Sequence, residues 1–298
     1  MDVHGSRGRR LSAALAFPLA LALAGCVRMG PLAGRATDEW TKTYPLTAGG
    51  ELHVRNTNGR VEITGGNGST VEVHAVRIAR AVTDEGARQL LPRVTIKEDI
   101  TPARISLETE RMGIMVGAGF EVQYQIKVPQ GAVVDATTTN GQIVLSALDG
   151  KVTARSTNGG VKATDLSGPV DARSTNGQVA VDLKSLGPDK IYLGTTNGGV
   201  LLTLPDEAKA DVTATWTNGG FSITGLKLDA SKEARRRIEG TINGGGTPIE
   251  LHTTNGGIRV RARAAQASTG EAEAPGLGSP GRVDVKHRSG LTAYGERR

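Results

Sequence analysis

The sequence is poor in cysteine, in aromatic residues and in clustered histidine, and each shortage excludes a class of protein. One cysteine in 298 residues rules out a disulfide framework and a cysteine-rich metal site. Aromatic residues make up only 3% of the chain, which leaves few side chains to stack on bases or to grip sugar rings. No two of the five histidines stand at helical ligand spacing, so we expect neither a metal site nor a cofactor.

The chain carries a formal net charge of +6, and that charge resides in its two ends. Residues 1–25 hold three arginines and one aspartate, and residues 259–298 hold eight Lys or Arg and four acidic residues. The stretch 26–258 is therefore neutral overall. A nucleic-acid-binding protein needs a basic face, preferably with aromatic residues beside it, so nucleic acid is not an expected partner. The 38% hydrophobic content is nevertheless sufficient for a sizeable core.

The first 25 residues have the pattern of an export signal. Three arginines among the first ten residues precede an apolar run over 11–24 that is too short to span a bilayer comfortably. The run ends in Leu23-Ala24-Gly25-Cys26, which resembles the lipobox of bacterial lipoproteins. That resemblance implies a diacylglyceryl group on the Cys26 sulfur, cleavage before Cys26 and acylation of the new amine.

An ordinary signal peptide with an incidental cysteine is the alternative. The lipoprotein interpretation is favoured because the only cysteine of the chain stands in that one slot. Val27, rather than an aspartate, follows it, and by resemblance to Gram-negative sorting this favours the outer membrane. We therefore expect an extracytoplasmic cell-envelope protein that is held by membrane lipid through Cys26, in the outer membrane if the host is Gram-negative.

The middle of the chain is a repeat built on Thr-Asn-Gly and a short apolar alternation. Its asparagines are predicted to form a structural turn ladder: Asn140, Asn158, Asn176, Asn197, Asn218 and Asn255. An outlying copy stands at 55–63 and a degenerate one at 241–249. From Asn140 to Asn218 the copies lie 18 to 21 residues apart, with a second turn signal such as Leu-Asp-Gly between them. Periods near twenty are typical of a stacked architecture.

Two all-β folds fit this repeat. Asn-Gly between alternating apolar residues is a hairpin signal, which allows an antiparallel β-meander or sandwich. The alternative is a β-solenoid, in which like residues of successive coils stack about 4.8 Å apart. We favour a solenoid of about six coils of 18–21 residues, because only stacking gives identity between units a physical reason. Stacked asparagines can form a hydrogen-bonded ladder, and each adjacent glycine is expected to take a left-handed turn.

The flanks of the repeat suggest the following organisation. Residues 40–129 are predicted to form an N-terminal β cap with one irregular coil at Asn58 and one short helix between Thr83 and Pro92. The other predicted segments are the lipoprotein signal peptide 1–25, a tether 26–39, the Asn-Gly repeat solenoid 130–263, a flexible linker 264–281 and a C-terminal segment 282–298. The sequence leaves open whether 282–298 is a closing strand or a loose end.

These residues carry a resemblance to a known family. The N-terminal cysteine, the strand that ends in Val128-Pro129 and the repeated Thr-x-Asn-Gly-x-Val resemble the bacterial "putative adhesin" family of β-strand repeat proteins, a domain of unknown function. The resemblance covers about residues 40–260, and the copy at Asn243 departs from the pattern. It implies a β-solenoid-like fold and an envelope location.

The function favoured by the sequence is non-catalytic binding or scaffolding at the cell surface. Arg155, Thr157, Arg173 and Thr175 are predicted to point outward and to form a flat polar face for a surface glycan or an envelope protein. An ordinary solvated strand face is the alternative. A role as an envelope-stress sensor or regulatory partner of another membrane protein fits equally, because nothing in the sequence separates it from adhesion.

A polysaccharide-active β-helix enzyme is the weaker alternative. Such an enzyme needs two acidic residues held roughly 5–10 Å apart. The candidates Asp149, Asp165, Asp171 and Asp182 stand at different offsets from the preceding asparagine, so they are not expected to cluster. We therefore expect no catalytic residues.

Overall fold

The computed structural model describes residues 32–113 and 117–263, which form twenty-one β-strands, one α-helix and one 3₁₀ turn. The predicted signal peptide 1–25, Cys26, the linker 264–281 and the segment 282–298 lie outside the described residues. The strands belong to two sheets. Sheet A has the order β1-β4-β7-β3-β9-β11-β13-β15-β21-β17, and sheet B has the order β18-β19-β16-β20-β14-β12-β10-β8-β2-β6-β5.

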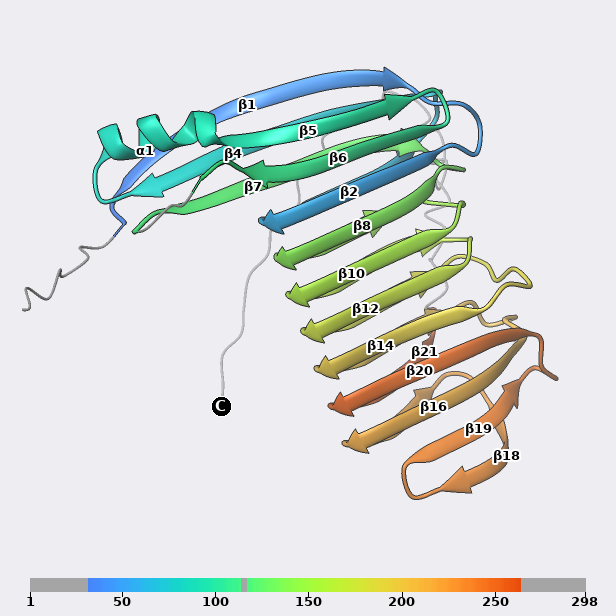
Figure 1. Ribbon diagram of the computed structural model, residues 1–298. Helices are drawn as coiled ribbons and strands as arrows, with labels where there is room; N and C mark the ends of the chain where they lie inside the picture. Colours follow the sequence, from blue (N-terminus) through green and yellow to red (C-terminus); the bar gives the residue numbers. More distant parts are fainter. Residues whose placement is uncertain (1–31, 114–116, 264–298) are drawn as a thin grey trace, which may run out of the picture. The chain divides into compact units, whose positions relative to one another are not determined.

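Seven coils make up the repeat, and each gives one strand to sheet B and the next to sheet A (Figure 1). The pairs are β2 (Glu51–Asn58) and β3 (Val61–Gly66), β8 (Val133–Asn140) and β9 (Ile143–Ser146), β10 (Val152–Asn158) and β11 (Val161–Leu166), β12 (Val170–Asn176) and β13 (Val179–Leu183), β14 (Ile191–Asn197) and β15 (Val200–Leu204), β16 (Ala210–Asn218) and β17 (Phe221–Thr224), and β20 (Thr247–Asn255) and β21 (Ile258–Ala262).

The predicted β-solenoid is confirmed, and the antiparallel meander is wrong. Neighbouring coils pair in parallel with like residues in register, so that Ala154 lies opposite Ala172 and Asn158 opposite Asn176. The coils number seven instead of about six, because β2 and β3 pair with β8 and β9 as a full coil. Inward positions carry small or branched residues, and Val152, Ala154 and Val170 are at most 1% exposed. Parallel stacking therefore buries one continuous core between the two sheets.

The last coil in the sequence is not the last in space. β20 pairs with β14 on one side and with β16 on the other, and β21 lies in the same way between β15 and β17. Figure 1 shows the orange-red β20 between β14 and β16. The intervening hairpin of β18 (Leu228–Ala234) and β19 (Arg237–Ile242) covers the far edge of β16 in antiparallel register.

The degenerate repeat copy at 241–249 forms the turn between β19 and β20. Asn243 has a φ of 50°, in the left-handed region. Its side-chain Nδ2 donates to the backbone carbonyls of Asp206 and Ala208, both at 2.9 Å. The Asn-Gly at 243 thus closes a turn outside the asparagine ladder, which explains why its sequence departs from the other copies.

The cap extends both sheets at the other end of the solenoid. Sheet A continues into β7 (Gly119–Pro129), β4 (Thr70–Ala81) and β1 (Gly34–Pro45), and sheet B continues into β6 (Arg104–Arg111) and β5 (Val94–Thr101). The predicted short helix is confirmed as α1 (Asp84–Leu90), where the Thr83 hydroxyl caps the helix by accepting from Gly86 N at 3.1 Å. A 3₁₀ turn (Leu91–Arg93) follows it.

Two boundaries predicted from the sequence need correction. The sequence predicts a tether over 26–39, but β1 begins at Gly34 because its residues pair in register with β4, with Gly34 opposite Ala81. It also predicts a cap over 40–129 with one irregular coil at Asn58, but residues 51–66 form a regular first coil of the solenoid. The chain therefore enters the solenoid once before it builds the rest of the cap.

The structure joins the asparagines of all seven coils in one row. Each side-chain Nδ2 donates to the Oδ1 of the asparagine in the preceding coil at 2.7–2.9 Å, in the spatial order Asn58, Asn140, Asn158, Asn176, Asn197, Asn255, Asn218. A second row lies just inside it, where the hydroxyls of Ser156, Ser174, Thr195 and Thr253 donate to glycine carbonyls of the neighbouring coil at 2.7–2.9 Å. The Thr-x-Asn-Gly turn is thus bonded both to the adjacent side chain and to the adjacent backbone.

The glycines of these turns do not share one backbone conformation, so the predicted left-handed turn does not explain all of them. Gly59 and Gly219 have φ values of 118° and 143°, Gly159 and Gly198 have values of 158° and 159°, and Gly141 lies outside the positive-φ region altogether. A Cβ on Gly159 would stand 2.0 Å from the carbonyl oxygen of Gly141 in the preceding coil. Close approach of two backbones therefore requires glycine here.

Candidate functional site

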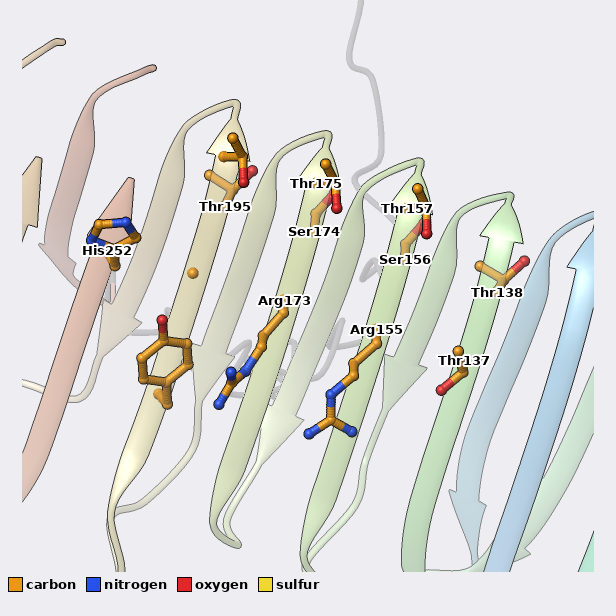
Figure 2. Close-up of a pocket in the computed structure, with 13 residues that line it drawn as sticks. Thr137, Thr138, Arg155, Ser156, Thr157, Arg173, Ser174, Thr175, Thr195 and His252 are labelled. Carbon is orange, nitrogen blue, oxygen red and sulfur yellow. The ribbon is translucent and has the colours of Figure 1, made fainter. Parts of the chain in front are cut away.

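The candidate site is a shallow depression of about 440 Å³ on the outer face of sheet B. Its lining comes from β8, β10, β12, β14 and β20, which lie side by side (Figure 2). All four residues of the predicted ligand face, Arg155, Thr157, Arg173 and Thr175, line it. The depression thus follows from the outward row that the repeat places on consecutive strands.

Threonine precedes the ladder asparagine in every coil, which gives the site a regular hydroxyl edge. These residues are Thr57, Thr139, Thr157, Thr175, Thr196, Thr254 and Thr217. Thr157, Thr175 and Thr196 line the depression and are exposed. Figure 2 shows Thr157 and Thr175 near the strand ends, beyond the side chains of Arg155 and Arg173. The site therefore has an arginine row beside a threonine row.

One carboxylate organises both arginines. The Asp171 carboxylate accepts hydrogen bonds from Nε and Nη2 of Arg173 at 2.6 and 3.1 Å. It also accepts one from Nη2 of Arg155 at 3.1 Å. The hydrogen bond to Asp171 raises the pKa of Arg173, so its guanidinium stays charged. The Asp171 side chain is 26% exposed, whereas those of the two arginines are 45% and 49% exposed. The carboxylate is therefore less exposed to solvent than the two guanidinium groups that it positions.

Tyr192 and Gly194 are site residues that the sequence reasoning missed. In the other coils the position of Tyr192 carries an acidic residue, a threonine or a histidine, and that of Gly194 carries an arginine, a threonine or His252. A Cβ on Gly194 would stand 2.9 Å from Cε1 of Tyr192, so the missing side chain makes room for the ring. Arg173 lies over that ring, 4.2 Å from its centroid. The signal that could have found this site is the single Tyr-x-Gly among seven repeats.

His252 joins the site through the unexpected coil order. It lies opposite Gly194 because β20 packs directly on β14, although 58 residues separate them in sequence. A solenoid stacked in sequence order would have placed Thr215 of β16 there instead. Among the residues that line the depression, none is aspartate or glutamate. The lining is therefore cationic and rich in hydroxyl groups.

The sequence-predicted separation of the four acidic candidates is wrong for one pair. Asp165 and Asp182 both bind Arg263 on sheet A, with Nη2 of Arg263 3.4 Å from Oδ2 of Asp182. Burial raises the pKa of Asp182, and the charge of Arg263 acts in the opposite direction. Asp171 belongs to the opposite sheet. Arg263 directly follows the last residue of β21, so its ion pairs with the two carboxylates tie the end of that strand to β11 and β13.

Within the ranges 32–113 and 117–263, no group of three or more His, Cys, Asp or Glu side chains could hold a metal ion. The helices in those same ranges are all too short or too polar to cross a membrane. The predicted lipid-attachment residue, Cys26, falls outside them.

A family model described as Toastrack DUF4097 matches residues 48–261. The chain belongs to the Toastrack DUF4097 family. This confirms the resemblance inferred from the repeat, and the match spans the seven coils and most of the cap. No curated protein is similar enough to this Toastrack chain to be matched.

The solved structures that are similar to this Toastrack chain include two from different organisms. A "putative cell adhesion protein" from Clostridium sporogenes has 12% identity and a TM-score of 0.45, over 76% of this chain and 100% of its own. A "putative adhesin" from Bacteroides fragilis has 10% identity and a TM-score of 0.36, over 76% of this chain and 97% of its own. At these values neither is evidence of a shared activity.

Proposed function

We propose that this protein is a lipid-anchored component of the cell envelope whose Toastrack solenoid binds or scaffolds a surface glycan or envelope protein without catalysis. The observation that carries the proposal is the depression on sheet B, where Tyr192 and Gly194 stand at two outward positions that hold neither tyrosine nor glycine in the other six coils. A local departure from a repeated surface gives that surface a distinctive position at which a ligand can bind.

The chemistry of the lining favours binding over catalysis. Guanidinium, hydroxyl, phenol and imidazole groups line the depression, and its nearest carboxylate, Asp171, is held by two arginines. The other acidic pair, Asp165 and Asp182, belongs to the opposite sheet and shares Arg263. An acid pair that flanks a scissile bond needs two carboxyl groups that both face the substrate, whereas Asp171 is held by two arginines and Arg263 pairs with both Asp165 and Asp182.

The binding face is tested by photo-cross-linking on intact cells. A photoreactive amino acid at Thr175, inside the depression, is expected to capture an envelope component that mass spectrometry identifies. The matched control places it at Lys162, an exposed residue of β11 on the outer face of sheet A. Equal capture from both positions would contradict a dedicated face. Capture of one membrane protein would indicate a sensory or assembly partner, and capture of glycan would indicate an adhesin.

The anchor is tested by Cys26→Ala. We expect the variant to lose metabolic labelling with a fatty acid and to keep its signal peptide, because the sulfur that accepts the lipid is gone. Val27→Ala is the control, since it keeps the cysteine and should be labelled like the wild type. Persistent labelling of the Cys26→Ala protein would refute the lipid anchor and the envelope location that depends on it.

A further inference from the structure

The two arginines of the depression keep donors for a further anion. Asp171 engages Nε and Nη2 of Arg173 and Nη2 of Arg155. Among the hydrogen bonds of the described residues, none involves Nη1 of Arg173 or the Nε and Nη1 of Arg155. Arg155, Arg173 and Asp171 together carry one net positive charge. The residues that line the depression include no acidic side chain, and Glu250, whose charge also acts on Arg173, is paired with Lys190.

These donors are also held in place before any ligand arrives. Arg173 is fixed by the bidentate contact with Asp171 and by the ring of Tyr192 at 4.2 Å. Figure 2 shows the Arg155 and Arg173 side chains extending in the same direction from neighbouring strands. A planar guanidinium matches a carboxylate in two parallel hydrogen bonds, and a side chain that is already ordered loses less entropy on binding.

The shape of the depression favours a chain-like ligand. It crosses five strands, so its length along the stacking direction is about 20 Å, from the ~4.8 Å spacing of neighbouring strands. The exposed hydroxyls of Thr157, Thr175 and Thr196 run along it in the same direction. A linear polymer with regularly spaced polar groups can contact both rows at once, whereas a small anion would use only the arginine pair.

We propose that the depression binds a linear acidic polysaccharide, with its sugar carboxylates at Arg155 and Arg173 and its hydroxyl groups along the row of Thr157, Thr175 and Thr196. This inference rests on the proposed function and names its ligand class. Tyr192 keeps Arg173 in position, and Gly194 leaves room for its ring. His252 closes the end of the depression on β20.

The test measures binding of the detergent-solubilised full chain to polygalacturonate and to neutral dextran. We expect polygalacturonate to bind and dextran to bind far more weakly, and we expect the affinity for polygalacturonate to fall as NaCl rises. The double variant Arg155→Gln/Arg173→Gln should lose about 100-fold in affinity, because two charge-assisted contacts disappear. The double variant Arg155→Lys/Arg173→Lys should have an affinity between those of the wild type and the glutamine variant. It keeps the positive charges but loses the paired N–H donors of each guanidinium group.

The matched control is Arg259→Gln/Lys162→Gln, which removes two exposed positive charges from the outer face of sheet A. It should bind polygalacturonate like the wild type, and circular dichroism should show all three double variants folded. Equal loss in the control, or unchanged binding by Arg155→Gln/Arg173→Gln, would overturn the inference. So would equal affinity for dextran, or binding to phosphatidylglycerol vesicles in place of polygalacturonate.

These outcomes separate the inference from the proposed function. If neither polysaccharide binds while cross-links from Thr175 persist on cells, the ligand class is wrong and the binding face stands. If cross-linking from Thr175 and Lys162 is also equal, both proposals fail.

Discussion

Replacing Gly159 by alanine is expected to destabilise the protein by about 3 kcal/mol or more. The new Cβ would lie 2.0 Å from the carbonyl oxygen and 2.5 Å from the carbonyl carbon of Gly141. Both are backbone atoms, so no side-chain rotation relieves the contact. The carbonyl of Gly141 also accepts the Ser156 hydroxyl at 2.9 Å, and Gly141 N donates to Asn158 O at 3.1 Å. Relief therefore requires separating two coils at their turn, which also strains the bond between Asn158 and Asn140.

Chemical denaturation of the wild type and the variant measures this effect, and Gly220→Ala is its control. Gly220 belongs to an Asn-Gly-Gly turn like that of Gly159, but a Cβ there would meet nothing within 4 Å. We expect Gly220→Ala to change stability by less than about 0.5 kcal/mol. A Gly159→Ala protein as stable as this control would show that the turn can widen at no cost, against the close stacking described here.

Leu251→Ala is expected to cost about 2–5 kcal/mol and to loosen the end of the solenoid selectively. Leu251 is fully buried in β20, where it lies opposite Leu193 of β14 and Ala214 of β16. In the described sheets, β16 and β17 pair with the other coils only through β20 and β21, so weakening that coil should free the terminal one. Hydrogen exchange should show faster exchange of the β16 and β17 amides than of those in β8 and β10.

Leu145→Ala provides the comparison for this experiment. Leu145 is also fully buried, and it stands in β9, between β3 and β11. Its truncation removes the same number of atoms, but it should leave the protection of β16 unchanged relative to neighbouring coils. If Leu251→Ala and Leu145→Ala affected β16 alike, the intercalated position of β20 would not govern the stability of the end coil.

Repetition in the sequence predicted the parts of the fold that depend on local identity. Alternation over 152–158 fixes which residues face inward, and the recurrence of Asn158 at 176 fixes their stacking, because a shift of one residue would expose the core. The helix followed from the capping residue Thr83 and the stop at Pro92. The outward positions of Arg155 and Arg173 follow from the same alternation.

Only the tertiary structure shows which residues of different coils lie next to each other where the coils differ in sequence. Seven similar coils offer nearly equivalent partners, so pattern alone does not determine that β20 packs on β14 before β16. That order brings His252 to the depression, and the end of the following strand, β21, brings Arg263 between Asp165 and Asp182. The need for glycine at Gly159 arises from the distance to another coil, which no local conformation reveals. Local periodicity specifies the face of each strand, whereas neighbours across the sheets depend on long-range packing between coils.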